Sequence, residues 1–524
     1  MQGAQAPAPA QRCSVDSGWT LGSRYQGRQI GSVRVVTAAP APLPAAPDAI
    51  ENLHVRTRQA TIRRHLLFAD GEVVDTIRVA ESLRRLRRLR YLSDVAIVAT
   101  SCATDTPVDL AVVTRDAWST EPSVKVRGSG SAVVGLEERN VLGTGRDARV
   151  YVRSDGAQLG FGAAYTDPWV AGTNVAASVA RNVYRDGGDW TAGVGLRERS
   201  VFDRWRANID VARSAREAPA TVGDTVRREM ASLLVGRRIA QSPSGATSFL
   251  AGAEYAEARV AAGAGAVIVG PSAVRREFLG ADVGLARRAA SYGVATWYLP
   301  GGQPLELPVA LEGEALIGVG RDIAFGLPAQ HADAWLGRFW MPRNRFVLSA
   351  DAWGSGYRIG QQWSAGSLRL ALGADAAAWR GRWTARAAAE QLSDPDPDVR
   401  ALASADPTVA ALPSRARLAE TALAISIERD FDVHRVARSY MLDIAAVGAG
   451  SMRWDPAAGG ERPTVGAVGV GLRLLPARAG LARMGLDVGF PVLRSAGVPP
   501  RPFFAITISP WLEASRMRDG RRAR

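Results

Sequence analysis

Arginine is the commonest residue in this chain that could do chemistry, and the densest group of arginines is the run LRRLRRLRYL, Leu83 to Leu92. Such a run could bind nucleic acid, lie on a membrane surface or form the solvated face of a helix. The chain has 65 Lys and Arg residues against 51 Asp and Glu, for a formal net charge of +14. These arginines are scattered along the whole sequence, whereas a nucleic-acid protein concentrates its charge on one patch. The composition therefore argues against a nucleic-acid partner.

The residue types that support catalysis or metal binding form no recognisable arrangement. The chain has four histidines, His54, His65, His331 and His434. They are far apart in sequence and predict no metal site. No nucleophile–histidine–acid set can be assembled from them, so we expect neither enzyme activity nor a cofactor.

Two further segments have a chemical reading and a simpler structural one. The acidic stretch SDPDPDVR (Ser393 to Arg400) could attract calcium, but its alternating prolines are more typical of a solvated loop. The Gly-x-Gly spacing in AAGAGAVIVG (Ala261 to Gly270) lacks the strand–turn–helix context of a dinucleotide site. A surface loop is the better interpretation of both.

The two cysteines, Cys13 and Cys102, match no metal-ligand spacing. In an oxidising compartment they could form one disulfide bond between the N-terminal tail and the first domain. The alternative is two unrelated free thiols, and the sequence leaves both readings open.

No run of about 18 apolar residues occurs, so no transmembrane helix is expected. The first residues, MQGAQAPAPAQRC, have neither the basic nor the apolar region of a signal peptide. The chain is then either cytoplasmic, or its first residue here lies downstream of the true start. We favour the second interpretation, because AQAPAPAQ resembles the small-residue start of a mature exported protein.

Residues 1–30 read as a tail, and the next ninety residues predict a small domain. A β-branched strand (Ser32 to Thr37) is followed by a Pro-rich linker and by two helical patterns. The first helix spans Ala60 to Leu67, and the second, Thr76 to Arg90, repeats apolar residues at three-residue steps. Two strands then follow, Val95 to Thr100 and Val108 to Trp118. The predicted order is βααββ.

After Trp118 the helical periodicity gives way to alternation. In LRLAL, for example, Leu368, Leu370 and Leu372 alternate with arginine and alanine. Period two with one apolar face is typical of half-buried strands, and here the second face is small or charged, as in a polar lumen. The 14 tryptophans fall mostly near strand ends, as in an interfacial girdle. In lipid such a sheet has to close, because every backbone group must be paired.

The predicted fold is therefore mainly β. Residues 31–118 form a small α+β domain, and residues 119–524 form a transmembrane antiparallel β-barrel of about 16 strands with a basic C-terminal tail.

Four short motifs resemble those of one protein family. GLEERNVLGTGRDARVYV (Gly135 to Val152) resembles an early barrel hairpin with an N-x-L-G-T-G turn, and YTDPWVAGT (Tyr165 to Thr173) resembles the turn after the next strand pair. Phe68 to Ile97 resembles the second half of a POTRA (polypeptide-transport-associated) domain, and GLDVGFPV (Gly485 to Val492) a penultimate strand. In this order the motifs resemble the BamA/TamA superfamily of outer-membrane assembly and translocation barrels.

The resemblance implies a mechanism with two working parts. An exposed POTRA edge strand would capture an extended client by adding it to the sheet. The residues expected at this edge are Val95, Ala96, Ile97, Val98, Ala99 and Thr100. The barrel would open at the seam between its first and last strands. The seam residues expected are Ser123, Val124, Lys125, Val126, Phe504, Ile506, Ile508 and Pro510. Proline cannot donate a ladder hydrogen bond, so Pro510 could weaken the seam or simply end its strand.

The family also carries an arginine on a loop that folds into the barrel, and the nearest candidate here is Arg321 in GVGRDIAFG. On such a loop, Arg321 would bridge to lumen carboxylates such as Asp487. The simpler reading is one lumen arginine among many.

The expected function is insertion or translocation of client polypeptides in the bacterial outer membrane, with the POTRA domain in the periplasm. Its partners would be outer-membrane lipids and extended or unfolded clients, with periplasmic chaperones or lipoproteins as further candidates. A passive outer-membrane pore or structural scaffold is the alternative. A soluble nucleic-acid binder is a remote third reading.

In this context the run LRRLRRLRYL reads as part of the second helix. Leu83, Leu86 and Leu89 would pack on the small sheet, and the arginines between them would form its solvated face. The alternative for these arginines is contact with acidic lipid headgroups or an acidic client. The arginines concerned are Arg84, Arg85, Arg87, Arg88 and Arg90.

Overall fold

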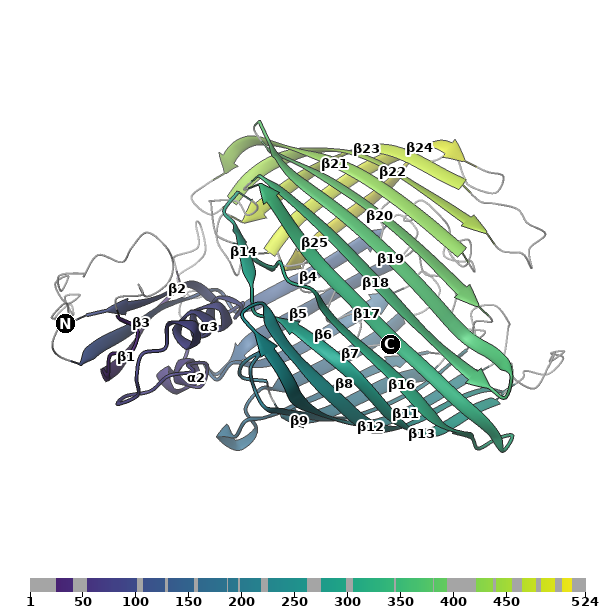
Figure 1. Ribbon diagram of the computed structural model, residues 1–524. Coiled ribbons are helices and arrows are strands. Elements are labelled where there is room, and N and C mark those ends of the chain that lie inside the picture. The colour runs from purple at the N-terminus through teal and green to yellow at the C-terminus, as the bar shows by residue number, and fades with distance from the viewer. Residues whose placement is uncertain are drawn as a thin grey trace.

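The chain consists of a small N-terminal domain attached to one end of a large β-barrel (Figure 1). The computed structural model describes residues 25–40, 54–100, 107–127, 131–154, 159–185, 187–196, 198–217, 225–261, 275–297, 305–343, 345–379, 381–393, 421–436, 440–454, 464–476, 482–494 and 502–510.

The small domain has the predicted βααββ order. Its elements are β1 (Ile30–Ala38), α2 (Gln59–Arg63), α3 (Thr76–Arg87), β2 (Leu92–Ala99) and β3 (Val108–Asp116). Its sheet has the order β1-β3-β2, with β1 parallel and β2 antiparallel to the central strand β3. The Pro-rich linker falls mostly outside the described residues.

Helix α3 begins at the cap residue Asp75, whose side chain accepts hydrogen bonds from the backbone N–H groups of Ile77 and Arg78. Its apolar face, including Leu83 and Leu86, packs into the buried core between the helices and the sheet. Tyr25 is buried in the same core, so the domain includes residues before β1 that the sequence assigned to the tail.

The described residues of the barrel form a closed antiparallel sheet of twenty strands. The ten strands of its first half are β4 (Thr120–Arg127), β5 (Ser131–Val141), β6 (Arg146–Ser154), β7 (Leu159–Asp167), β8 (Val175–Tyr184), β9 (Gly187–Leu196), β10 (Trp205–Glu217), β11 (Thr225–Ser242), β12 (Gly245–Ala261) and β13 (Arg275–Ala289). The other ten are β16 (Glu312–Asp322), β17 (Leu327–Arg343), β18 (Phe346–Ile359), β19 (Gln362–Ala378), β20 (Gly381–Ser393), β21 (Thr421–Val436), β22 (Tyr440–Trp454), β23 (Thr464–Pro476), β24 (Ala482–Arg494) and β25 (Phe503–Pro510).

The sequence-based expectation of about 16 strands is wrong, because the described barrel has twenty. The strands from β4 to β9 have only 8 to 11 residues each. Short turns join several of these strands. This stretch therefore contains more strands per residue than the expected arrangement, in which longer outer loops separate the strands. The predicted fold class, a closed barrel after a βααββ domain, is confirmed.

A hairpin interrupts the barrel between β13 and β16. It consists of β14 (Tyr292–Ala295) and β15 (Leu305–Pro308), which pair only with each other in the described part of the chain. The hairpin lies at the end of the barrel that faces the small domain, here called the docked end (Figure 1).

The outer face of the barrel is apolar, as the alternation predicted. Leu368, Leu370 and Leu372 on β19 are each about half exposed, and the same holds for alternate residues on most strands. Four exposed tryptophans lie near the docked end, as in an interfacial girdle: Trp205, Trp340, Trp379 and Trp383. No helix in the described part of the chain is both long and apolar enough to cross a membrane.

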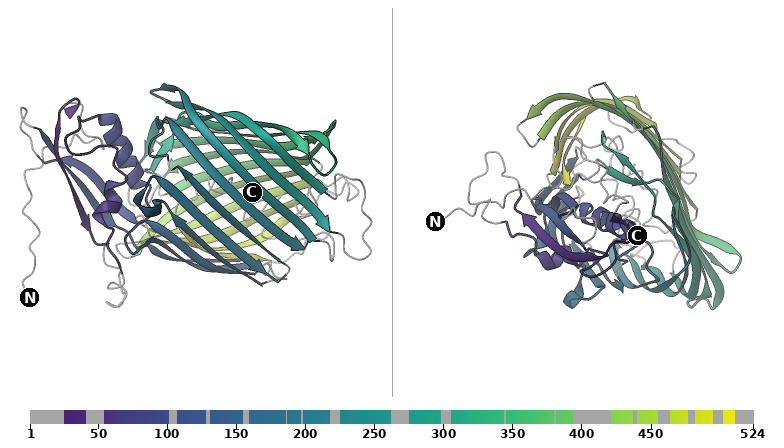
Figure 2. Two further views of the ribbon diagram at one scale, coloured as in Figure 1. Left: turned by 90° about the horizontal axis from the view of Figure 1, so that it is seen from below. Right: turned by 60° about the vertical axis from the view of Figure 1, so that its left-hand side comes forward.

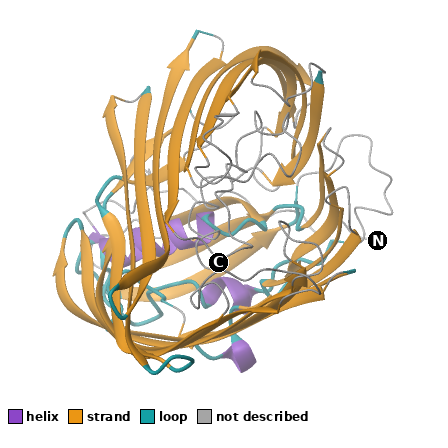
Figure 3. Ribbon diagram, turned by 90° about the vertical axis from the view of Figure 1, so that its right-hand side faces the viewer, coloured by secondary structure: helices purple, strands orange, loops and turns teal. Residues whose placement is uncertain are grey.

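The strands run obliquely across the barrel, and the small domain lies against its docked end (Figure 2, left). The view toward that end shows α3 lying in front of the barrel opening (Figure 2, right). From the opposite end, the helices are seen across part of the same opening (Figure 3). The small domain therefore partly covers the opening at the docked end.

Candidate functional site

The barrel closes where its last strand meets its first, and this seam is its shortest joint. Strands β25 and β4 pair over four residues each, Ala505 to Ile508 with Val124 to Arg127. Every other pair of neighbouring barrel strands is joined over at least eight residue pairs. The seam therefore holds about half as many ladder positions as the next shortest joint.

The hydrogen-bond pattern of the seam follows from the pattern between β4 and its other neighbour, β5. The backbone N–H of Arg139 donates to the carbonyl of Ser119, so odd-numbered residues of β4 bond β5. Even-numbered residues therefore face β25, because backbone groups alternate in direction along a strand. The seam then holds two hydrogen-bonded pairs, Val124 with Ile508 and Val126 with Ile506.

Proline limits the seam at the docked end. Continuing the register by two residues places Pro510 opposite Pro122, at the next position where two strands would exchange hydrogen bonds. Neither proline has an N–H, so this pair cannot form. Of the predicted seam residues, Val124, Lys125, Val126, Ile506 and Ile508 lie within the paired stretch. Ser123, Phe504 and Pro510 lie in the same strands just beyond it.

The second predicted working part, strand β2, lies at an edge of the small sheet. The other edge strand, β1, is partly covered by side chains. Asp70 accepts a hydrogen bond from Val33 N (2.5 Å), and Arg63 donates one to Val33 O (2.6 Å). Strand β2 is therefore the more open edge for an added strand.

The outward groups of β2 can be assigned from one bond. The N–H of Thr100 donates to the carbonyl of Asp109, so even-numbered residues bond β3. The N–H groups of Val95, Ile97 and Ala99 then point toward the open side. Of the edge residues named from sequence, Val95, Ala96, Ile97, Val98 and Ala99 lie in β2, and Thr100 follows it directly.

The N-x-L-G-T-G motif forms the β5–β6 turn, and this turn joins the barrel to the small domain. The side chain of Asn140 donates to Thr57 Oγ1 (2.8 Å) and accepts from Gly145 N (2.8 Å). The carbonyl of Gly143 accepts from Arg58 N (2.9 Å) and from Thr61 Oγ1 (2.9 Å). The motif is therefore a docking turn, in which Asn140 and Gly143 supply these hydrogen bonds to the small domain.

Two more turns at the docked end contact the helices. Trp169, in the β7–β8 connection with the short helix η2 (Val170–Gly172), is buried and packs edge-on against His65 at 5.3 Å between ring centroids. The carboxylate of Glu81 on α3 accepts hydrogen bonds from Ser200 Oγ (2.7 Å) and Val201 N (2.9 Å). Together with the β5–β6 turn, these contacts hold the domain at three places along the barrel rim.

The arginine run on α3 makes a fourth contact, with the β14–β15 hairpin. The guanidinium groups of Arg84 and Arg88 lie 4.9 and 5.1 Å from the ring centroid of Tyr292. Arg87 forms an ion pair with Glu306 at 3.3 Å. This corrects the expectation of a solvated face, because the hairpin lies far away in sequence and no local pattern links it to the helix.

Arg321 does not lie on an inward loop. It is a residue of strand β16, paired with Leu279 and Pro328, and its side chain is exposed on the same face as Ile317 and Val319. A tight turn joins β16 directly to β17, so no loop forms at this point. Asp487, the partner considered for it, pairs with Arg473 instead.

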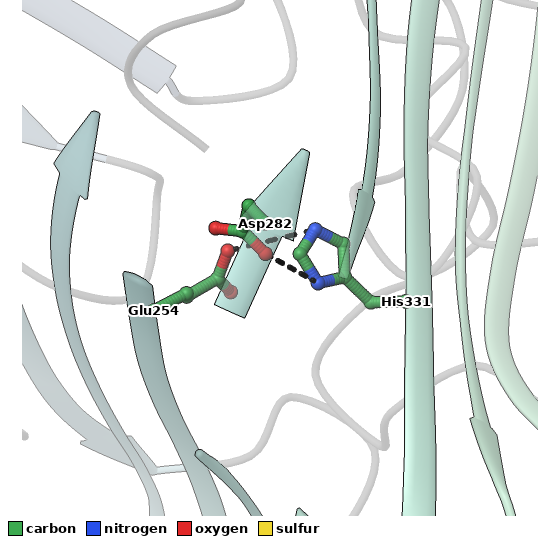
Figure 4. A group of neighbouring side chains, drawn as sticks. All are labelled: Glu254, Asp282 and His331. Carbon is green, nitrogen blue, oxygen red and sulfur yellow. Dashed lines mark ion pairs between the residues drawn. The ribbon is translucent and has the colours of Figure 1, made fainter. Parts of the chain in front are cut away.

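The sequence analysis missed a cluster inside the barrel. Glu254 of β12, Asp282 of β13 and His331 of β17 point toward one another (Figure 4). His331 lies 3.7 Å from each carboxylate, through Nε2 to Glu254 and through Nδ1 to Asp282. The three residues come from separate strands, so only the strand order and register could reveal their proximity.

Other sites considered from sequence fall outside the described residues. Cys13 and Cys102 both do, and so do most of the acidic stretch Ser393 to Arg400 and of the Gly-x-Gly stretch Ala261 to Gly270.

The closed sheet, its apolar exterior and the domain docked at one end define a class, a transmembrane β-barrel that carries one POTRA-like domain. Comparison with solved structures finds similarity across most of the chain to BamA from Haemophilus ducreyi lacking POTRA domains 1–3. That match has 12% identity and a TM-score of 0.36, and it covers 92% of this chain and 85% of that one.

CdiB from Escherichia coli matches with 12% identity and a TM-score of 0.42, over 91% of this chain and 76% of that one. CdiB from Acinetobacter baumannii matches with 11% identity and a TM-score of 0.41, over 91% and 74%. No protein-family model matches the chain, and neither does any curated protein sequence.

Proposed function

We propose that this chain inserts or translocates client polypeptides in the bacterial outer membrane, with its small domain on the periplasmic side. The observation that carries this proposal is the seam of four residue pairs between β4 and β25. Opening it breaks on the order of four backbone hydrogen bonds, fewer than at any other joint between the described strands. The motif resemblance to the BamA/TamA superfamily supports the same function.

In this proposal a client binds in two steps. An extended segment first pairs with the open edge of β2, using backbone groups and therefore little sequence preference. The segment then reaches the exposed backbone of β4 or β25 when the seam opens. Pro122 and Pro510 favour opening from the docked end, because that end of the seam lacks a hydrogen-bonded pair.

Locking the seam tests this mechanism. Lys125→Cys with Thr507→Cys places two cysteines at a directly opposed pair that exchanges no backbone bonds, where Cα atoms are about 4.5 Å apart and a disulfide can form. Val133→Cys with Arg153→Cys is the matched control, at the equivalent kind of pair between β5 and β6. Both variants are made in a chain whose Cys13 and Cys102 are replaced by Ser.

The proposal predicts that the seam lock depletes specific outer-membrane or surface proteins from cells, that reducing agent restores them, and that the control lock has no effect. A fully oxidised seam lock that leaves the outer-membrane proteome unchanged would favour a passive pore or scaffold.

Client capture is tested separately by photo-crosslinking. A crosslinking amino acid at Ala96, exposed on β2, is expected to trap extended polypeptides, whereas the same residue at Arg34, exposed on β1, is expected to trap few. Equal trapping from both positions would argue against the β2 edge as the capture site.

A further inference from the structure

The barrel wall brings three ligand-type side chains to one point in the lumen. Asp282 of β13 is paired with Gly318 of β16, and Gly318 is paired with His331 of β17. Asp282 and His331 therefore lie on either side of a glycine at the same level of the sheet. Glu254 projects to the same point from β12 (Figure 4).

The distances between the His331 ring nitrogens and the two carboxylates fit a cation bound between the residues better than direct hydrogen bonds. Nδ1 of His331 is 3.7 Å from Oδ1 of Asp282, and Nε2 is 3.7 Å from Oε2 of Glu254. These distances are too long for hydrogen bonds. Two ligand atoms that each lie about 2.1 Å from a tetrahedral Zn²⁺ are about 3.4 Å apart. One cation binds only one of the two ring nitrogens of His331, so only one of the two 3.7 Å distances can separate two ligand atoms of the same cation. One ligand atom from each residue can be chosen so that all three lie within 4.8 Å of one another.

Burial makes the arrangement costly without a cation. Asp282 is 5% exposed and His331 is 6% exposed. Among the described residues, Asp282 Oδ1 and His331 Nδ1 have no hydrogen-bond partner, and they face each other. A buried carboxylate oxygen and a buried ring nitrogen that face each other at 3.7 Å without a hydrogen bond destabilise a fold unless a further group binds them.

The surroundings keep the space between the ligands open. A Cβ atom on Gly318 would overlap Nδ1 of His331 and lie 2.5 Å from Oδ1 of Asp282. Tyr357 donates a hydrogen bond to Oε1 of Glu254 (2.9 Å) and so orients that carboxylate. Phe278, fully buried, packs edge-on against His331 at 5.3 Å between ring centroids.

We propose that Glu254, Asp282 and His331 bind one divalent transition-metal cation, for which Zn²⁺ is the best-suited probe. One imidazole nitrogen and two carboxylate oxygens form a three-residue ligand set with a charge of −2, and zinc accepts this set with a fourth position open to water. Calcium and magnesium fit less well, because both prefer oxygen ligands alone. A bound cation would connect β12 and β13 to β17, with Gly318 of β16 lying between Asp282 and His331.

The test measures Zn²⁺ binding by the full chain in detergent, purified without a polyhistidine tag and stripped with a chelator. Titration calorimetry and elemental analysis are expected to give one Zn²⁺ per chain. His331→Ala is expected to abolish that site. Gly318→Ala is expected to abolish it too, although it retains all three ligands.

His54→Ala is the control, because His54 also lies beside a buried carboxylate, that of Asp116 at 2.9 Å, but forms no three-residue ligand group among the described residues. It is expected to retain the Zn²⁺ site. Heat-modifiable electrophoretic migration shows that each variant is folded. Absence of saturable Zn²⁺ binding by the folded parent chain, or binding that survives both His331→Ala and Gly318→Ala, would overturn the proposal in favour of a histidine held between two carboxylates.

Discussion

The guanidinium of Arg87 on α3 lies 3.3 Å from the carboxylate of Glu306 on β15, and this pair joins segments that are 219 residues apart in sequence. Both side chains are largely shielded from solvent. Burial lowers the pKa of Arg87, and the Glu306 carboxylate opposes that shift. The contact connects the small domain to a hairpin that belongs to the barrel, so it bears directly on whether the domain can move.

Reversing the charge of Arg87 should loosen the domain. Arg87→Glu places two carboxylates face to face and is expected to weaken docking by about 2 kcal/mol, roughly 30-fold in the docked–undocked equilibrium. The measurement is the rate of limited proteolysis of the small domain in the folded, detergent-solubilised chain. The double variant Arg87→Glu with Glu306→Arg should restore the parent rate.

Arg78→Glu serves as the control for this experiment, because Arg78 lies on the same helix and pairs with Glu72 of the small domain, both side chains being exposed. Its cleavage rate should match that of the parent chain. Equal acceleration by Arg78→Glu and Arg87→Glu would mean that helix charge, and not the contact with Glu306, controls the rate.

The docking turn offers a comparison between two glycines with similar backbones. Gly143 has φ 73° and Gly326, in the β16–β17 turn at the opposite end, has φ 68°. An alanine at either position costs about 1–2 kcal/mol in left-handed backbone. At Gly143 the new Cβ would also overlap the carbonyl oxygen of Arg56, whereas at Gly326 nothing lies within 4 Å.

Gly143→Ala should therefore accelerate proteolysis of the small domain, and Gly326→Ala should not, although both lower barrel stability slightly. If the two variants behaved alike in this assay, the close approach of Gly143 to Arg56 would have no role in docking.

A buried ion pair between strands β4 and β5, near the docked end, should contribute strongly to the free energy of unfolding of the barrel. Arg139 lies 2.6 Å from Glu121, and both side chains are about 5% exposed or less. Arg139 also pairs with Glu137 at 3.0 Å, so Arg139→Met leaves two carboxylates without this guanidinium and is expected to cost about 3–5 kcal/mol. The free energy of urea unfolding in lipid vesicles measures this loss.

Arg213→Met is the matched control, because Arg213 and Glu229 form an ion pair at 3.2 Å whose side chains are 43% and 34% exposed. Its expected cost is about 1 kcal/mol or less. Similar losses at both sites would show that burial does not set the strength of ion pairs in this lumen.

Replacing the two prolines at the seam should stabilise the pairing of β4 with β25. The double variant Pro122→Val with Pro510→Val supplies two N–H groups at the next hydrogen-bonded position of the seam. Two added bonds of about 1 kcal/mol each should reduce opening roughly 30-fold, seen as slower hydrogen exchange of the Val124 and Val126 amides.

Pro476→Val is the control, since Pro476 ends strand β23 away from the seam. It should leave exchange at Val124 and Val126 unchanged. Faster exchange in the double variant would show that the prolines support the seam rather than limit it.

The local pattern of apolar residues in the sequence was sufficient to predict the main features of this fold. Alternating Leu368, Leu370 and Leu372 predicted strands with one apolar face, because side chains of a strand alternate between its two sides. The three-residue spacing of Leu83, Leu86 and Leu89 predicted the helix of the small domain for the corresponding reason. The end of the last strand at Pro510 was also visible in the sequence.

Tertiary structure decided the features that depend on strand order and register. The sequence alone could not place Glu254, Asp282 and His331 together, because their contact requires four strands to be aligned to the residue. A shift of one residue would turn any of these side chains to the outer face. The pairing of Arg87 with Glu306 was hidden for a related reason: a solvated helix face and a docked one have the same amphipathic pattern until the partner surface is in place.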